Sequence, residues 1–130
     1  MARESKPSNM CPCGSGKLYS DCCGRFHDGK AVPETPEQLM RSRYSAFVVK
    51  NPMYLLDTWH PTTRPSELNL ADPVKWLSLK IKSTGFISPD EGFVHFIARG
   101  LIAGRGFKQE EKSRFLKENG RWFYVDGILS

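Results

Sequence analysis

The sequence lacks the features of several large classes of protein. Its 130 residues contain no apolar run close to the roughly 20 residues that cross a bilayer as a helix, so we expect no membrane span. Residues 1–10 are polar and lack the apolar core of a signal peptide. No cysteine follows Cys23, so most of the chain has no disulfide framework. Reduced cysteines without an export signal predict a cytoplasmic protein.

Common catalytic motifs are also missing. The chain has no Ser-His-Asp order, no phosphate-binding glycine loop and no dinucleotide fingerprint. The glycine-rich segment 100–106, interpreted as a connection between strands, lacks the strand-to-helix setting that a phosphate loop requires. These absences favour a binding role over an enzymatic one.

Charge is distributed unevenly along the chain. The formal net charge is +5, and residues 75–121 hold ten Lys or Arg against five Asp or Glu. A basic surface attracts RNA, ribosomes or acidic proteins. A lysine-rich strand face that discourages edge-to-edge aggregation explains the same pattern. With 39% hydrophobic residues, the composition fits one small globular domain.

All four cysteines lie in one short segment, as Cys11-x-Cys13 and Cys22-Cys23. Two cysteine pairs joined by a small-residue turn can place four thiolates around one zinc ion. Residues 14–16, Gly-Ser-Gly, supply that turn, because glycine adopts the positive backbone angles that wrap the chain around a metal. The spacing predicts one structural zinc, held by all four cysteines.

Two alternatives for this cluster remain open. Cys22 and Cys23 are adjacent, which is awkward for two ligands of one ion, so His27 is a candidate in place of Cys23. Two disulfides are the other alternative, but they need an oxidising compartment for which the chain shows no signal.

The cysteine segment resembles a known motif. Residues 11–24, which read Cys-x-Cys-Gly-Ser-Gly-Lys-x-Tyr-x-x-Cys-Cys-Gly, are similar to the SEC-C motif, the zinc-binding tail of the preprotein translocase motor SecA. The resemblance implies a knuckle that docks on a protein or ribosome-type partner. Lys17, Tyr19 and Arg25 are the residues we expect to bind that partner.

The chain divides into four predicted parts: a flexible N-terminus (1–10), a zinc knuckle (11–27), a linker (28–34) and an α+β domain (35–130). The first helix is predicted over residues 36–49, with Thr35 as N-cap and Gln38 completing a capping box. Asn51-Pro52 ends that helix and caps a second one. Residues 61–74, with three prolines, are predicted to form a loop.

From Lys75 the apolar period changes from about 3.6 to 2, which indicates a sheet of four consecutive antiparallel strands. Residues 93–99 are nearly all apolar, so their strand is expected to be central, and Asn119-Gly120 predicts a tight hairpin. The predicted core of this α+β fold consists of Leu39, Phe47, Leu55, Trp59, Leu77, Leu79, Phe96 and Phe115.

The order of elements is similar to the nuclear-transport-factor-2-like (cystatin-like) fold, in which a curved sheet and helices form a cone. Residues 39–48, 58–61, 113–120 and 126–127 resemble the YchJ family of bacterial proteins, which also opens with a SEC-C motif. Some members carry a second SEC-C motif at the C-terminus, whereas this sequence ends without one.

The implied cone would contain a pocket that binds a peptide or a small molecule. Its candidate lining residues are Arg41, Tyr44, Trp59, His60, Arg99, Glu111 and Ser113. An alternative function is a small-pocket enzyme with Glu111 or His60 as acid or base, because burial beside apolar walls tunes such groups. A structural Arg–Glu ion pair is the plainer explanation of the same residues.

Overall fold

The computed structural model describes residues 10–70 and 74–129. The elements are the short 3-10 helix η2 (Tyr19–Asp21), helices α1 (Cys23–His27), α2 (Pro36–Val48) and α3 (Pro52–Asp57), and strands β1 (Val74–Ser88), β2 (Glu91–Ile102), β3 (Arg105–Glu118) and β4 (Arg121–Leu129). The predicted α+β class is confirmed. The predicted flexible N-terminus lies outside the described residues except for Met10, as do 71–73 of the predicted loop.

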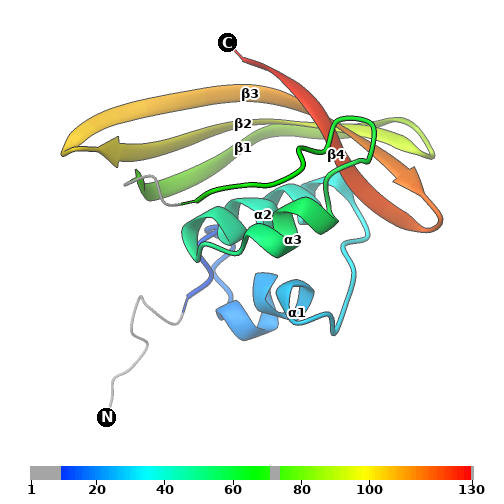
Figure 1. Ribbon diagram of the computed structural model, residues 1–130, viewed down its shortest axis with the longest axis horizontal. Helices are drawn as coiled ribbons and strands as arrows, with labels where there is room; N and C mark the ends of the chain where they lie inside the picture. Colours follow the sequence, from blue (N-terminus) through cyan, green and yellow to red (C-terminus); the bar gives the residue numbers. More distant parts are fainter. Residues whose placement is uncertain (1–9, 71–73, 130) are drawn as a thin grey trace.

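The molecule is built in three layers (Figure 1). A curved antiparallel sheet forms one side, α2 and α3 lie beneath it, and α1 with the cysteine-rich turn lies on the other side of the helices. No helix among the described residues is long and apolar enough to cross a bilayer. Helix α2 is therefore the middle layer, in contact with the sheet and with α1.

Helices α2 and α3 both begin where the sequence predicts. Thr35 Oγ1 accepts a hydrogen bond of 3.1 Å from the backbone N–H of Gln38, and Pro36 occupies the first helical position. The Gln38 side chain accepts from the N–H of Glu34 at 2.7 Å, one residue before the position of an ideal capping box. Asn51 caps α3 in the same way, with its Oδ1 accepting from the N–H of Tyr54 at 3.1 Å.

The strand order is β1-β2-β3-β4, so β2 is internal, as its apolar sequence predicts. Asn119 and Gly120 have φ angles of 54° and 79°, the left-handed values that a tight two-residue hairpin requires. Ala103 and Gly104 repeat this geometry with φ angles of 53° and 79°. The predicted connection over 100–106 is therefore wrong in its bounds, because β2 and β3 continue to either side of a two-residue turn.

The core lies between the sheet and α2. Its buried cluster consists of Leu39, Met40, Tyr44, Val94, Phe96, Ala98, Phe115 and Trp122. Of the other predicted core residues, Leu55 is buried, and Phe47, Trp59 and Leu79 are half-buried.

Leu77 is the exception, with 54% of its surface exposed. The pairing of β1 with β2 shifts between Trp76 and Ser78, so Leu77 sits in a bulge and strict alternation fails there. Trp76 takes the inward position and packs edge-on against Tyr44 and Phe107. The prediction that Leu77 belongs to the core is wrong for this reason.

This packing predicts different outcomes for two substitutions in the sheet. Phe96→Ala should lower the free energy of unfolding by about 3 to 5 kcal/mol, because it leaves a cavity in the core. Leu77→Ala should stay within about 0.5 kcal/mol of the parent. Urea unfolding monitored by circular dichroism measures both, and equal losses for the two variants would contradict the placement of the core.

Candidate metal centre and sheet cavity

The sulfur atoms of Cys11, Cys13, Cys22 and Cys23 lie within 4.8 Å of one another. The Sγ atoms of Cys13 and Cys22 are 3.7 Å apart, and none of the four forms a disulfide. Cys11, Cys13 and Cys23 are buried and Cys22 is half-buried. Four converging thiols of this kind could hold a metal ion.

The backbone explains how two adjacent cysteines reach one cluster. Gly14 and Gly16 have φ angles of 82° and 86°, which bend the chain back until the N–H of Cys11 donates to the Lys17 carbonyl at 2.9 Å. Cys22 lies between the end of η2 and the start of α1 and has a non-helical conformation. Because the chain changes direction there, Cys22 and Cys23 both face the other pair.

Two hydroxyl groups contact the cluster. Ser15 Oγ lies 3.2 Å from Cys22 Sγ, and Ser45 Oγ of α2 lies 3.5 Å from Cys11 Sγ. A hydrogen bond with Cys13 lowers the pKa of Cys11, whereas the hydrogen bond with Cys11 raises the pKa of Cys23. Without a cation, ionisation of one thiol therefore makes ionisation of its neighbours less favourable. A bound metal ion would allow all four to be thiolates.

His27 has other partners. Its Nε2 lies 2.9 Å from the backbone carbonyl of Ser42, which can only accept, so Nε2 carries the proton. Its Nδ1 then accepts from the Tyr19 hydroxyl at 2.5 Å. His27 thus uses Nε2 to fasten α1 to α2 and Nδ1 to hold Tyr19 of η2, and it lies outside the four-sulfur group.

The cysteine-rich turn is fixed to α2 by further contacts. Arg41 Nη1 donates to the Cys13 carbonyl at 2.9 Å, while its Nε bonds to Glu37 at 3.0 Å. Arg41, Ser42 and Ser45 form one side of α2, directed away from the sheet. The prediction that Arg41 lines a pocket under the sheet is wrong because its side chain leaves α2 on the side of the turn.

The three residues expected to bind a partner differ in exposure. Lys17 is exposed, and Arg25 is half-buried with its guanidinium 4.5 Å from the centre of the Phe26 ring. Tyr19 is half-buried, and its ring lies so close to Gly24 that a Cβ there would come within 3.0 Å of it. The structure thus exposes Lys17, holds Arg25 partly against Phe26 and uses Tyr19 partly as internal packing.

A cavity of about 130 Å³ lies between the helices and the sheet. Its lining residues are Met40, Arg43, Phe47, Trp59, Phe96, Gln109, Glu111, Ser113 and Tyr124. Trp59, Glu111 and Ser113, three of the residues expected to line a pocket, are among them.

Three other residues predicted for this pocket lie elsewhere. Arg99 is exposed, because its neighbours Ala98 and Gly100 face inward and successive strand residues face opposite ways. Tyr44 is in the core with its ring centre 5.9 Å from that of Trp76. His60 does not line the cavity either.

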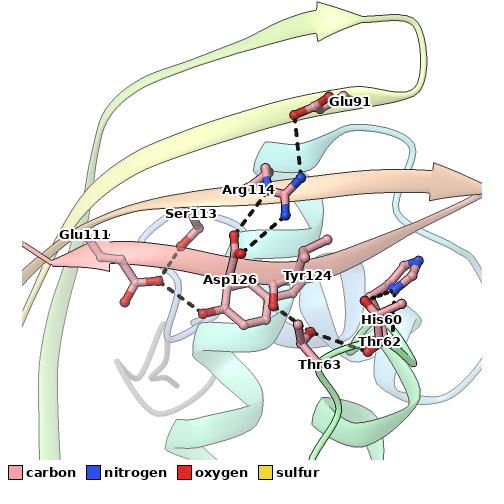
Figure 2. Close-up of polar contacts among 10 residues, drawn as sticks. His60, Thr62, Thr63, Glu91, Glu111, Ser113, Arg114, Tyr124 and Asp126 are labelled. Carbon is pink, nitrogen blue, oxygen red and sulfur yellow. Dashed lines mark hydrogen bonds and ion pairs between the residues drawn. The ribbon is translucent and has the colours of Figure 1, made fainter.

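Glu111 is held by three donors, of which Figure 2 shows Ser113 and Tyr124. The Ser113 and Tyr124 hydroxyls donate to its Oε2 at 2.7 and 3.3 Å, and the Gln109 amide donates to Oε1 at 3.3 Å. Burial, with a contribution from the Glu111 charge, raises the pKa of Tyr124 to about 12, so its hydroxyl keeps its proton at neutral pH. The carboxylate lies over Gly127, where an added Cβ would collide with it.

Arg43 is the cation of the cavity, and the sequence prediction missed it. Its Nη1 donates to the Leu55 carbonyl and to Thr58 Oγ1, both at 2.8 Å. Its guanidinium lies 5.0 and 4.6 Å from the ring centres of Trp59 and Tyr124. Burial lowers the pKa of Arg43 to about 10, which leaves it charged at neutral pH. Arg43 lies three residues after Met40 and four before Phe47, so all three share one side of the helix. This spacing could have indicated that Arg43 faces the sheet.

His60 is buried but engaged outside the cavity. Its Nδ1 accepts from the backbone N–H of Thr62 at 3.2 Å, so Nε2 donates to Glu118 Oε2 at 2.8 Å. Its backbone N–H bonds to the Tyr124 carbonyl at 2.7 Å. Figure 2 shows its ring directed away from Glu111. The two residues proposed as acid or base therefore do not share a site.

Comparison with known proteins decides the family. The family model described as YchJ, middle NTF2-like domain, matches residues 35–127, and the family model of the SEC-C motif matches residues 8–25. This chain belongs to the YchJ family. Among its relatives, a UPF0225 protein of Bordetella bronchiseptica is 54% identical over 133 residues, covering 99% of both chains. A UPF0225 protein of Ralstonia nicotianae is 45% identical and covers 95% of this chain and 94% of its own.

Two solved structures share this architecture. The solution structure of a SEC-C motif containing protein from Rhodopseudomonas palustris has a TM-score of 0.83 at 33% identity, covering 92% of this YchJ-family chain and 98% of its own. The crystal structure of a SEC-C motif containing protein from Psychrobacter arcticus has a TM-score of 0.77 at 29% identity, covering 92% of this chain and 82% of its own. The α+β fold is thus shared with other proteins that contain a SEC-C motif.

The geometry predicts that two arginines contribute unequally to stability. Arg43→Ala should cost about 2 to 4 kcal/mol, because it leaves two buried acceptors without their charged donor. Arg99→Ala removes the same charge from an exposed position and should cost less than about 0.5 kcal/mol. Chemical unfolding compares the two, and an Arg43→Ala protein as stable as the parent would contradict the buried role of Arg43.

Proposed function

We propose that this protein is a zinc-dependent adaptor. A zinc knuckle (residues 11–27) is held on an α+β cone (residues 35–130) through helix α2, with residues 28–34 as the linker, and it presents a basic surface to a protein partner. The observation that carries the proposal is the convergence of four thiols within 4.8 Å on a turn fixed to α2. A reducing compartment, the cytoplasm, suits such free thiols.

The sulfur geometry fits zinc. Four ligands at about 2.3 Å in tetrahedral directions are about 3.8 Å apart, and Cys13 and Cys22 are 3.7 Å apart. Four cysteine ligands leave no position for water, so the role is structural rather than catalytic. Cys23 rather than His27 completes the set, because both ring nitrogens of His27 have partners elsewhere.

The knuckle and the cone have separate cores. The cysteine cluster packs with Tyr19, whereas the main cluster lies between α2 and the sheet. Removal of the metal should therefore unfold the knuckle and leave the cone folded. Because Arg41 and Ser45 join the two, the metal also fixes the orientation of the knuckle on α2.

The exposed part of the knuckle suits an acidic protein surface. Lys17 is exposed, Arg25 follows in α1, and Leu18, which lies between them in the sequence, is 46% exposed. A rigid turn that presents cations beside an apolar side chain loses little entropy on binding. The phosphates of ribosomal RNA would also pair with the cations, but they would make no apolar contact with the exposed Leu18.

The enzyme alternative has less support. Glu111 already accepts three hydrogen bonds, and His60 is bonded to Glu118 outside the cavity. Neither arrangement leaves a free acid and base facing one substrate.

Metal analysis tests the first part of the proposal. Protein purified under reducing conditions should contain one equivalent of zinc, and Cys13→Ser should lose most of it because a tetrahedral set loses a ligand. His27→Gln is the matched control and should retain the metal. Loss of zinc in His27→Gln with retention in Cys23→Ser would contradict the ligand assignment.

Charge reversal tests the second part. The variant Lys17→Glu with Arg25→Glu should lose the partners that the parent captures from cell extract, and capture by the parent should weaken with added salt. Lys80→Glu with Lys108→Glu, which reverses two cations of the sheet, should capture them as the parent does. Equal loss of captured partners in both variants would show that overall charge, and not the knuckle, drives binding. Capture of ribosomes and no other partner would show that the partner is RNA and not an acidic protein.

A further inference from the structure

The outer face of the sheet, on the side away from α2, carries a cluster of cations that we call the basic patch. Arg99 points to this face because its neighbour Ala98 belongs to the core. Lys108 lies directly opposite Arg99 on β3, and two lysines of β1 lie opposite the residues two positions to either side of Arg99. The patch thus consists of four exposed residues: Lys75, Lys80, Arg99 and Lys108.

The positive charge of the patch is not neutralised. Arg99 and Lys108 face each other on neighbouring strands, and like charges directly opposite are destabilising. Glu110 is the nearest acid along β3, but its carboxylate lies 2.7 Å from His95 Nε2 and 3.6 Å from Lys82 Nζ. None of the four cations forms an ion pair within residues 10–70 and 74–129. The fold therefore keeps a surplus of positive charge here at a cost to stability.

Protection of a sheet edge does not explain this arrangement. Lysines on β1 discourage edge-to-edge aggregation, because β1 is an edge strand. Arg99 and Lys108 lie on β2 and β3, which are internal strands. Pairing with a second copy of the same face is unfavourable too, since two surfaces of one sign repel. A strongly anionic partner accounts for cations on the internal strands.

The patch lacks the apolar centre that protein interfaces generally have. Ile97 lies at its centre and is only 9% exposed, although no helix of the described chain lies over this face (Figure 1). The long side chains around Ile97 must therefore cover it with their apolar stems. Protein partners usually bury aromatic or aliphatic anchors at such a centre, whereas phosphates pair with the charged ends of lysine and arginine alone.

The surroundings of the patch also lack an open ring on which single-stranded bases could stack. The Phe93 ring lies so close to Gly85 that a Cβ there would come within 3.0 Å of it, and Lys112 Nζ lies 4.6 Å from the ring centre. Phe123 has the Arg121 guanidinium 5.8 Å from its ring centre. Single strands are generally bound in grooves with stacking aromatic side chains, but this face is convex (Figure 1). The shape and the covered rings favour a duplex.

We propose that the basic patch binds the phosphate backbone of double-helical RNA, independently of base sequence. An RNA helix displays phosphates and 2′-hydroxyls along a wide, shallow minor groove, which a convex face can enter. Ser78 is exposed and lies directly opposite Arg99, so it places a hydroxyl beside the patch for a 2′-hydroxyl. The patch is on the far side of the sheet from the knuckle, and the proposal does not rest on the adaptor function.

Fluorescence anisotropy of a labelled RNA duplex of about 20 base pairs tests this on the full-length, zinc-loaded protein. If each of the four cations contacts one phosphate, the affinity should fall about 50-fold between about 50 and 150 mM salt. Two duplexes of different sequence should bind equally. A DNA duplex and a single-stranded RNA of the same sequence should bind at least fivefold more weakly.

Two double variants with the same change of charge locate the site. Lys80→Glu with Lys108→Glu should weaken duplex binding at least tenfold, because it removes two phosphate contacts. Lys17→Glu with Arg25→Glu, on the knuckle, should bind the duplex within about threefold of the parent. Capture of protein partners should respond to the two variants in the opposite way, so the failure of one proposal is distinct from the failure of the other. Unchanged melting temperatures would show that both variants are folded.

Three results would overturn the proposal. The first is the absence of salt-dependent duplex binding at protein concentrations up to about 100 μM, the weak end of non-specific binding. The second is unchanged binding in Lys80→Glu with Lys108→Glu, or an equal loss in the knuckle variant, which would place the site elsewhere. The third is equal binding of the DNA duplex, or tighter binding of single-stranded RNA, which would mean that the patch does not recognise an RNA helix.

Discussion

Helix α2 contacts the sheet with one side and the cysteine-rich turn with the other, so most of its surface is buried. Its sheet side carries the apolar residues of the core together with Arg43, and its other side carries Arg41, Ser42 and Ser45. A helix used in this way cannot be amphipathic in the ordinary sense, because both sides need partners. Serine and arginine on the second side supply hydrogen bonds to a turn that has little apolar surface of its own.

The same constraint accounts for the polar cavity. Arg43 faces the sheet from α2 but directs its hydrogen bonds to the end of α3, at Leu55 and Thr58. Glu111 faces the helices from β3 and is held by neighbours on its own sheet, with Tyr124 on β4 and Gly127 leaving room for it. Each charge is thus fixed by its own layer, and the space between the layers stays polar at its ends and apolar along its walls.

Local signals in the sequence were sufficient for the parts of the fold that depend on a few neighbouring residues. Thr35 and Asn51 fix the starts of two helices through hydrogen bonds three residues away, and Asn119-Gly120 supplies the backbone angles of a hairpin. The cysteine segment is of the same kind, since its turn is closed by bonds between residues no more than seven apart. The bulge at Leu77 could not be predicted in this way, because it depends on the register between two long strands. The prediction placed Arg41 in the cavity, where the structure has Arg43, for a related reason. Both arginines lie on α2, and the partners on the two sides of this helix decide which of them faces the cavity.

The central claim is that one zinc ion organises the knuckle through four thiolates and so holds it on α2. Zinc K-edge X-ray absorption of the protein, purified under reducing conditions, tests this most directly. The account predicts a single shell of four sulfur atoms at about 2.3 Å. A shell that contains a nitrogen at about 2.0 Å in place of one sulfur, or protein without zinc, would contradict it.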